Sequence, residues 1–89
     1  MAIVLATYDL IKPGKDYKPV HDYLKRFTYC KGLESVWLLD TTVSCAKIRD
    51  DLQNLVDAND KVFVVRLMRD WGSHNYGCAD WLNQPARNW

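Results

Sequence analysis

The stretch Ile3-Val4-Leu5-Ala6-Thr7-Tyr8-Asp9 is apolar at almost every position and ends in a carboxylate. A run of this kind predicts a central strand that is covered on both faces of its sheet. The run Val62-Phe63-Val64-Val65 has the same character and predicts a second central strand, over residues 62–66, beside the first. Asp9 then stands where a buried strand stops, a position that is held rigidly by the sheet yet open to solvent or metal.

Two amphipathic helices are predicted between these strands. Asp16 can cap the first helix, Pro19 falls in its first turn, and its buried stripe recurs at helical spacing through Tyr17, Val20, Leu24 and Phe27. Ser44 is a suitable N-cap for the second helix, whose apolar face carries Ile48, Leu52, Leu55 and Val56.

The segment between the helices, residues 33–41, predicts a second strand region. It is either one bent strand or a hairpin that turns near Gly32, and the residues favour neither. The resulting order of elements predicts an α/β (α+β) protein with the βαββαβ order of the ferredoxin-like sandwich. Residues 1–89 would form a single domain with an aromatic-rich tail over 70–89, and the helices would cover only one face of the sheet.

The composition limits the classes of function. The chain has 89 residues, 48% hydrophobic and 26% charged content, and a net charge of +1, which is typical of a small globular domain and gives no strong field for nucleic acid. No apolar run approaches the ~20 residues that cross a bilayer, and the first residues lack the pattern of a secretory signal. We therefore expect no membrane partner and a cytoplasmic location. Three widely spaced cysteines, without a C-x-x-C pair, predict reduced structural thiols: Cys30, Cys45 and Cys78.

Several segments together resemble the SinR-like group of bacterial and viral proteins. The resemblance runs from Ile3 to about Leu82 and is carried by residues 6–10, by the Glu34-Ser35-Val36-Trp37-Leu38-Leu39 strand, by the Ile48-Arg49-Asp50 helix and by residues 56–61. That group is similar to the small ferredoxin-like subunit of the CRISPR spacer-acquisition complex and, more distantly, to VapD-type toxin ribonucleases.

The resemblance implies a homodimer in which Asp9 of each copy shares a divalent metal, Mg²⁺ or Mn²⁺. Asp9 would then be both metal ligand and catalytic residue, with the aromatic Tyr8 beside it on the nucleic-acid surface. Position alone supports another role, in which Asp9 accepts backbone N–H groups from the Lys12-Pro13-Gly14 turn. No His or Lys lies close to Asp9 in sequence to act as a general base.

Basic and aromatic residues supply the remaining candidates. Lys12, Lys15 and Arg26 surround the first turn and helix; they either bind a nucleic-acid backbone, as the resemblance implies, or are simply solvated. Arg69 follows the last strand and either forms an exposed pair with Asp70 or binds a phosphate of nucleic acid through its guanidinium. The tail aromatics either pack across the open sheet face and a dimer interface, with Trp37, Trp71 and Trp81 as its main contributors, or stack on a base through Trp71, Tyr76 or Trp81 with a hydrogen bond from His74.

Two functions follow from these residues and the resemblance. The first is a homodimeric nucleic-acid-handling protein that acts as a metal-dependent endonuclease on RNA or DNA. The second is a non-catalytic module that binds or sequesters a small nucleotide or a protein partner, in conflict between phage and host.

Overall fold

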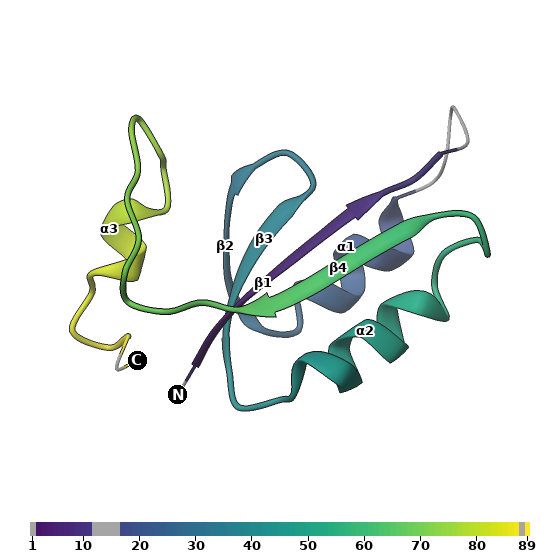
Figure 1. Cartoon of the computed structure of the whole chain (residues 1–89), viewed down its shortest axis with the longest axis horizontal. Coiled ribbons are helices and arrows are strands. Elements are labelled where there is room, and N and C mark those ends of the chain that lie inside the picture. The colour runs from purple at the N-terminus through teal and green to yellow at the C-terminus, as the bar shows by residue number, and fades with distance from the viewer. Residues whose placement is uncertain (1, 12–16, 88) are drawn as a thin grey trace.

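The computed structural model describes residues 2–11, 17–87 and 89, and its secondary structure follows the order β-α-β-β-α-β-α (Figure 1). The elements are β1 (Ala2–Asp9), α1 (Lys18–Leu24), β2 (Thr28–Leu33), β3 (Val36–Thr41), α2 (Cys45–Gln53), β4 (Lys61–Arg66) and the short α3 (Ala79–Leu82). The strands form one four-stranded sheet in the order β2-β3-β1-β4, and each neighbouring pair is antiparallel.

The prediction of a ferredoxin-like α+β fold is confirmed. Because all neighbours are antiparallel, each of the helices α1 and α2 joins two parallel strands that have a third strand between them, which is the split βαβ arrangement. Helices α1 and α2 lie together on one side of the sheet, and α3 with the tail lies at the other side (Figure 1). The element that the six-element pattern does not contain is α3.

The prediction that residues 62–66 form a central strand is wrong. β4 is adjacent to β1, as expected, but it lies at the edge of the sheet, and β3 is the second central strand. No residue of β4 is fully buried, and Phe63 is 61% exposed, whereas five of the six residues of β3 are buried. The continuous apolar run of β4 therefore does not reflect cover on both faces.

The main core lies between the sheet and the two helices. Tyr23 belongs to it, although the predicted stripe of α1 omitted this residue. Ser44 caps α2 as predicted, because its Oγ accepts the Lys47 backbone N–H at 3.1 Å. The cap predicted at Asp16 lies outside the described residues. The buried members of this core are Val4, Ala6, Tyr8, Leu10, Val20, Tyr23, Leu24, Trp37, Leu39, Ile48 and Leu52.

Residues 28–41 form a hairpin rather than one bent strand. The chain turns between β2 and β3 at Glu34 and Ser35, and Ser35 takes the left-handed φ of 59° that this turn requires. Gly32 lies within β2, next to a break in the register between Cys30 and Leu33. The turn therefore comes after Gly32, not at it.

The tail covers one end of the face that the helices leave open. It forms a second cluster with the sheet, in which Ile3, Leu38, Cys78 and Leu82 are buried. A disulfide joins Cys30 of β2 to Cys78, with a Cα–Cα distance of 6.0 Å, so the prediction of reduced thiols is wrong for this pair. Cys45 is free and half-buried.

A buried ion pair holds the end of the tail. The Arg87 Nη1 donates to Asp40 Oδ2 at 2.9 Å, and the Asp40 side chain is 3% exposed. Asp40 Oδ1 and Arg87 Nε have no partner in the described part of the chain. A buried carboxylate without a cation strongly destabilises the folded state, so this ion pair keeps the tail packed against the sheet.

Candidate functional site

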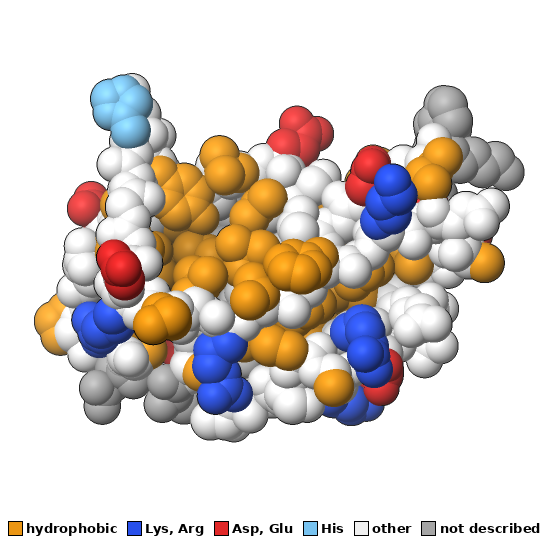
Figure 2. All heavy atoms as spheres, viewed as in Figure 1, with side chains coloured by type: hydrophobic (Ala, Val, Ile, Leu, Met, Phe, Trp, Pro, Cys, Tyr) orange, Lys and Arg blue, Asp and Glu red, His pale blue; other side chains and the backbone are white. Residues whose placement is uncertain are grey.

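The open sheet face and the tail enclose a hollow with a volume of about 350 Å³. Its sheet side is apolar, and its opposite wall is the segment from Trp71 to Tyr76. Figure 2 shows hydrophobic side chains gathered over this face beside the tail. The sheet and connecting residues that line the hollow are Leu5, Leu33, Val36, Leu38 and Leu67, and Leu82 of α3 lines it from the tail.

Gly32 lets the tail approach the sheet at the edge of this pocket. A Cβ at this position would lie 2.9 Å from Cys78 Sγ and would overlap the ring of Tyr76. Real Cβ atoms essentially never approach that closely, so any side chain at this position would push the tail away. The Cys30–Cys78 disulfide fastens the same contact covalently.

The polar groups of the pocket come from the segment between Trp71 and Tyr76. Asn75 has a left-handed φ of 55°, a conformation that Asn tolerates better than most residues. The Asn75 Nδ2 lies 3.2 Å from His74 Nε2, and His74 Nδ1 has no hydrogen-bond partner among the described residues. Burial raises the pKa of the Tyr76 phenol, which keeps its hydroxyl protonated at neutral pH. Among the described residues, the lining of the pocket includes no Lys, Arg, Asp or Glu.

Asp9 lies on the same sheet face but outside this pocket. It is exposed at the end of β1, opposite Lys61 of β4, and its carboxylate has no hydrogen-bond partner among the described residues. The turn that it could have capped, Lys12-Pro13-Gly14, lies outside those residues. Asp60 acts as a local acceptor instead, since its Oδ1 accepts the Ile11 N–H at 3.0 Å and its Oδ2 accepts the Asp57 N–H at 2.8 Å.

The described residues near Asp9 do not complete a metal site by themselves. No cluster of three or more His, Cys, Asp or Glu side chains that could hold a metal occurs in residues 2–11, 17–87 and 89. Mg²⁺ requires several oxygen ligands, and Asp9 offers one carboxylate beside a lysine. A metal at Asp9 would therefore need ligands from beyond the described residues of one chain.

Tyr8 and Trp37 are not on the surface, so the structure corrects their predicted roles. Trp37 is 1% exposed and Tyr8 is 5% exposed, both beneath the helices. Trp37 Nε1 donates to the Tyr8 hydroxyl at 3.3 Å, and that hydroxyl lies 3.0 Å from His21 Nε2. Since the indole N–H can only donate, the Tyr8 O–H is free to donate to His21. Tyr8 cannot reach a nucleic acid, and Trp37 cannot form a dimer interface, without unfolding this core.

His21 of α1 is half-buried in this cluster. Burial lowers its pKa below the ordinary value, and the positive charges of Lys31 and Lys25 lower it further. A neutral imidazole can accept the Tyr8 hydrogen bond, whereas an imidazolium cannot. No local pattern predicts this contact, because Tyr8 and His21 lie on different elements.

Of the predicted basic residues, the structure places Arg26 and Arg69 on different sides of the sheet. Lys12 and Lys15 lie outside the described residues. Arg26 follows α1 and lies over the ring of Tyr23, 5.8 Å from its centroid. Arg69 follows β4 and lies 4.9 Å from the centroid of the Trp89 ring, on the tail side of the sheet. Arg26 and Arg69 therefore belong to different layers of the molecule.

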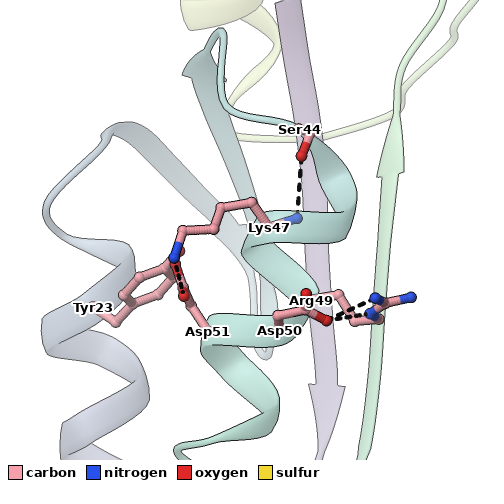
Figure 3. A network of polar contacts seen from close by, with 6 residues as sticks. All are labelled: Tyr23, Ser44, Lys47, Arg49, Asp50 and Asp51. Carbon is pink, nitrogen blue, oxygen red and sulfur yellow. Dashed lines mark hydrogen bonds and ion pairs between the residues drawn. The ribbon is translucent and has the colours of Figure 1, made fainter.

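A polar network that the sequence did not indicate links the two helices (Figure 3). Asp51 accepts the Tyr23 hydroxyl and the Lys47 ammonium, each at 2.7 Å. The hydrogen bond from Lys47 holds the pKa of the Asp51 carboxyl below its usual range, and burial raises the pKa of Tyr23. The network joins α1 to α2 through the Tyr23–Asp51 hydrogen bond.

Trp71 and Trp81 pack against the cluster beneath the tail, as one of the two sequence alternatives proposed. Both are half-buried, and the Arg87 guanidinium lies 4.5 Å from the centroid of the Trp81 ring. Trp71 also lines the pocket, whereas Trp81 does not. The two tryptophans therefore differ in position: Trp81 packs against the core beneath the tail, whereas Trp71 also faces the hollow.

The helices of the structure bear on the membrane prediction. No helix in the described ranges has both the length and the apolar character needed to cross a bilayer.

No protein-family model matches the chain, and no solved structure matches it. The resemblance to the SinR-like group stays a prediction from the sequence.

Proposed function

We propose that this protein is a non-catalytic binding module whose pocket takes a planar aromatic molecule without net charge, such as a nucleobase or a nucleoside. The observation that supports this function is the hollow of about 350 Å³ between the apolar sheet face and the Trp71–Tyr76 segment. Ligand pockets in proteins combine apolar walls with a few polar groups in this way. Its volume lies near the lower end of the ~300–1,000 Å³ range for such sites, which suits a small ligand.

The composition of the walls favours a heterocycle over other small molecules. Trp71 and Tyr76 offer aromatic surface, and stacking on a base contributes about 1–3 kcal/mol in single-strand binding proteins. Ser73, His74 and Asn75 place hydroxyl, imidazole and amide groups at the rim, where they can meet the polar edge of a ring.

The charge of the walls argues against recognition of a phosphate. Phosphate binding in proteins relies on Lys, Arg or helix N-termini, and the described lining residues include no Lys or Arg. A phosphate on the ligand would meet no Lys or Arg side chain among the described lining residues. The nucleoside therefore forms the recognised part, and a nucleotide should bind no better than the nucleoside.

Titration of the labelled protein with nucleosides and their monophosphates tests this function. We expect backbone amide shifts that cluster at residues 71–76 and at Leu5 and Leu38, with monophosphate affinity equal to or below that of the nucleoside. Trp71→Leu should weaken binding at least tenfold. Phe63→Leu is the matched control, because Phe63 is an exposed aromatic of the same sheet that does not line the pocket. If none of the four nucleosides binds, or if Phe63→Leu weakens binding as much as Trp71→Leu does, the proposal is wrong.

The metal-dependent nuclease is a second candidate, and one observation favours it. The exposed Asp9 carboxylate has no partner among the described residues, so it is available to a cation that bridges two copies. RNA or DNA cleavage that requires Mg²⁺ or Mn²⁺ and is lost in Asp9→Asn would support this function. Cleavage that survives chelator or this substitution would exclude Asp9 as its catalytic residue.

The cellular location is a separate proposal. Three widely spaced cysteines without a C-x-x-C pair favour the cytoplasm, whereas a disulfide such as Cys30–Cys78 persists most readily in oxidising compartments. Alkylation of thiols during cell lysis distinguishes them. Three modified cysteines in the denatured protein would indicate a reducing, cytoplasmic location, and modification of Cys45 alone would contradict it.

A further inference from the structure

The sequence of the edge strand β4 is typical of a strand that pairs with a neighbour on each side. Val62, Phe63, Val64 and Val65 are all apolar, yet none is fully buried and Phe63 is 61% exposed. Proteins usually protect a sheet edge with a proline, a bulge, an inward charge or a covering segment. The pairing of β1 with β4 runs without a bulge over six residue pairs, and the four apolar residues include neither charge nor proline.

The unpaired side of β4 is set by its ladder with β1. Beyond the last register pair, the Leu67 N–H donates to the Ile3 carbonyl at 2.8 Å. Bonded positions alternate along an antiparallel ladder, so the odd positions 61–67 bond to β1 and the even positions direct their backbone groups away from it. Val62, Val64 and Arg66 thus present N–H and carbonyl groups at the edge, and no backbone bond to them comes from elsewhere in the described part of the chain.

We propose that two copies of this chain pair antiparallel along β4, with Phe63 on the twofold axis. In this register Val62 lies opposite Val64 of the second copy, so the outward backbone groups of both strands meet. Phe63 lies opposite its own copy, in a pair without backbone bonds, where side chains approach most closely. Asp60 lies opposite Arg66 of the second copy on both sides of the axis, which places opposite charges together.

Charge selects this register among those that the backbone allows. An axis at Val65 places Lys61 opposite Arg69 of the second copy, which pairs like charges. An axis at Val64 places Asp60 opposite Met68 and Val62 opposite Arg66, so no pair of opposite charges forms across the axis. Only the axis at Phe63 joins the apolar centres of the two strands and also balances the charges at their ends.

The pair so formed is a sheet that continues across both copies, with the helices of both on the same face. β2 remains the outer edge at each end, because it is the other terminal strand of the sheet. This interface is separate from the pocket under the tail and does not depend on its ligand. It also differs from an interface through the tryptophans, since β4 carries none of them.

Charge substitution at Phe63 tests the pairing through its symmetry. The wild-type protein should have a dimer mass in light scattering at micromolar concentration. Phe63→Lys and Phe63→Glu should each be monomers, because each places like charges in contact on the axis. An equimolar mixture of the two variants should recover the dimer mass, since the ammonium and carboxylate then face each other. Leu33→Lys is the matched control, because Leu33 is 55% exposed on β2 and should leave the dimer intact.

Cross-linking provides a second measurement that fixes the register. In a Cys45→Ser background, Phe63→Cys should form an intermolecular disulfide under mild oxidation, because the two positions are direct neighbours. Val65→Cys should not, since its two copies are offset by four residues along the strands, roughly 13 Å. A monomeric wild-type protein, single variants that stay dimeric, a mixture that stays monomeric, or equal cross-linking at both positions would overturn the proposal.

Discussion

Reduction of the Cys30–Cys78 disulfide should destabilise the protein strongly. The bond joins residues that are separated by 48 positions, so it closes a loop of more than half the chain. Constraint of the unfolded chain by a loop of this length contributes about 4 kcal/mol to the free energy of unfolding. Domains of this size have total stabilities of roughly 5–13 kcal/mol, so the bond supplies a large share. The resulting fall in Tm is about 15–30 °C.

Thermal unfolding followed by circular dichroism, with and without a phosphine reductant, measures this effect. Cys30→Ser should reproduce the Tm of the reduced wild type and should not respond to the reductant. Cys45→Ser is the matched control, because Cys45 is free and its removal leaves the disulfide intact. If reduction leaves the wild-type Tm unchanged, after alkylation has verified that both thiols are free, the disulfide does not stabilise the fold and the prediction is wrong.

Three further substitutions probe the tail and the helix-covered core. Gly32→Ala should destabilise by roughly 1–3 kcal/mol in urea unfolding because its Cβ has no space, whereas Gly72→Ala, which meets nothing within 4 Å, should change little. Arg87→Met should cost about 3–5 kcal/mol because it leaves Asp40 buried without its cation, and Asp40→Asn in the same chain should recover part of this loss. The lowered pKa of His21 means that the unfolded chain binds more protons below pH 6.5, so the free energy of unfolding should fall as the pH decreases from 7 to 5, and His21→Gln should flatten that dependence.

Local patterns in the sequence predicted most of the fold. The apolar run that ends at Asp9 is β1, and helical spacing located both long helices. The cap at Ser44 was predictable because its chemistry involves residues only three apart. The position of β4 was not predictable from its apolar run, because such a run is the same whether a strand is covered by its own chain or left with an exposed face.

The candidate pocket depends on contacts between distant residues, which no local pattern reports. Cys30 and Cys78 carry no spacing that indicates their bond, and the close contact of the tail with Gly32 is visible only once the chain is folded. The density of aromatic residues did indicate that the tail needs a partner. It could not indicate that Trp71 lines a hollow while Trp81 closes the core.

The position of ligand-induced amide shifts is the most direct test of the proposed function. In a titration with a nucleoside, we expect the largest shifts in residues 71–76 and in the facing strand residues Leu5 and Leu38, on both walls of the hollow. Shifts that cluster instead around Asp9 and Lys61, or the absence of any shift at millimolar nucleoside, would contradict it.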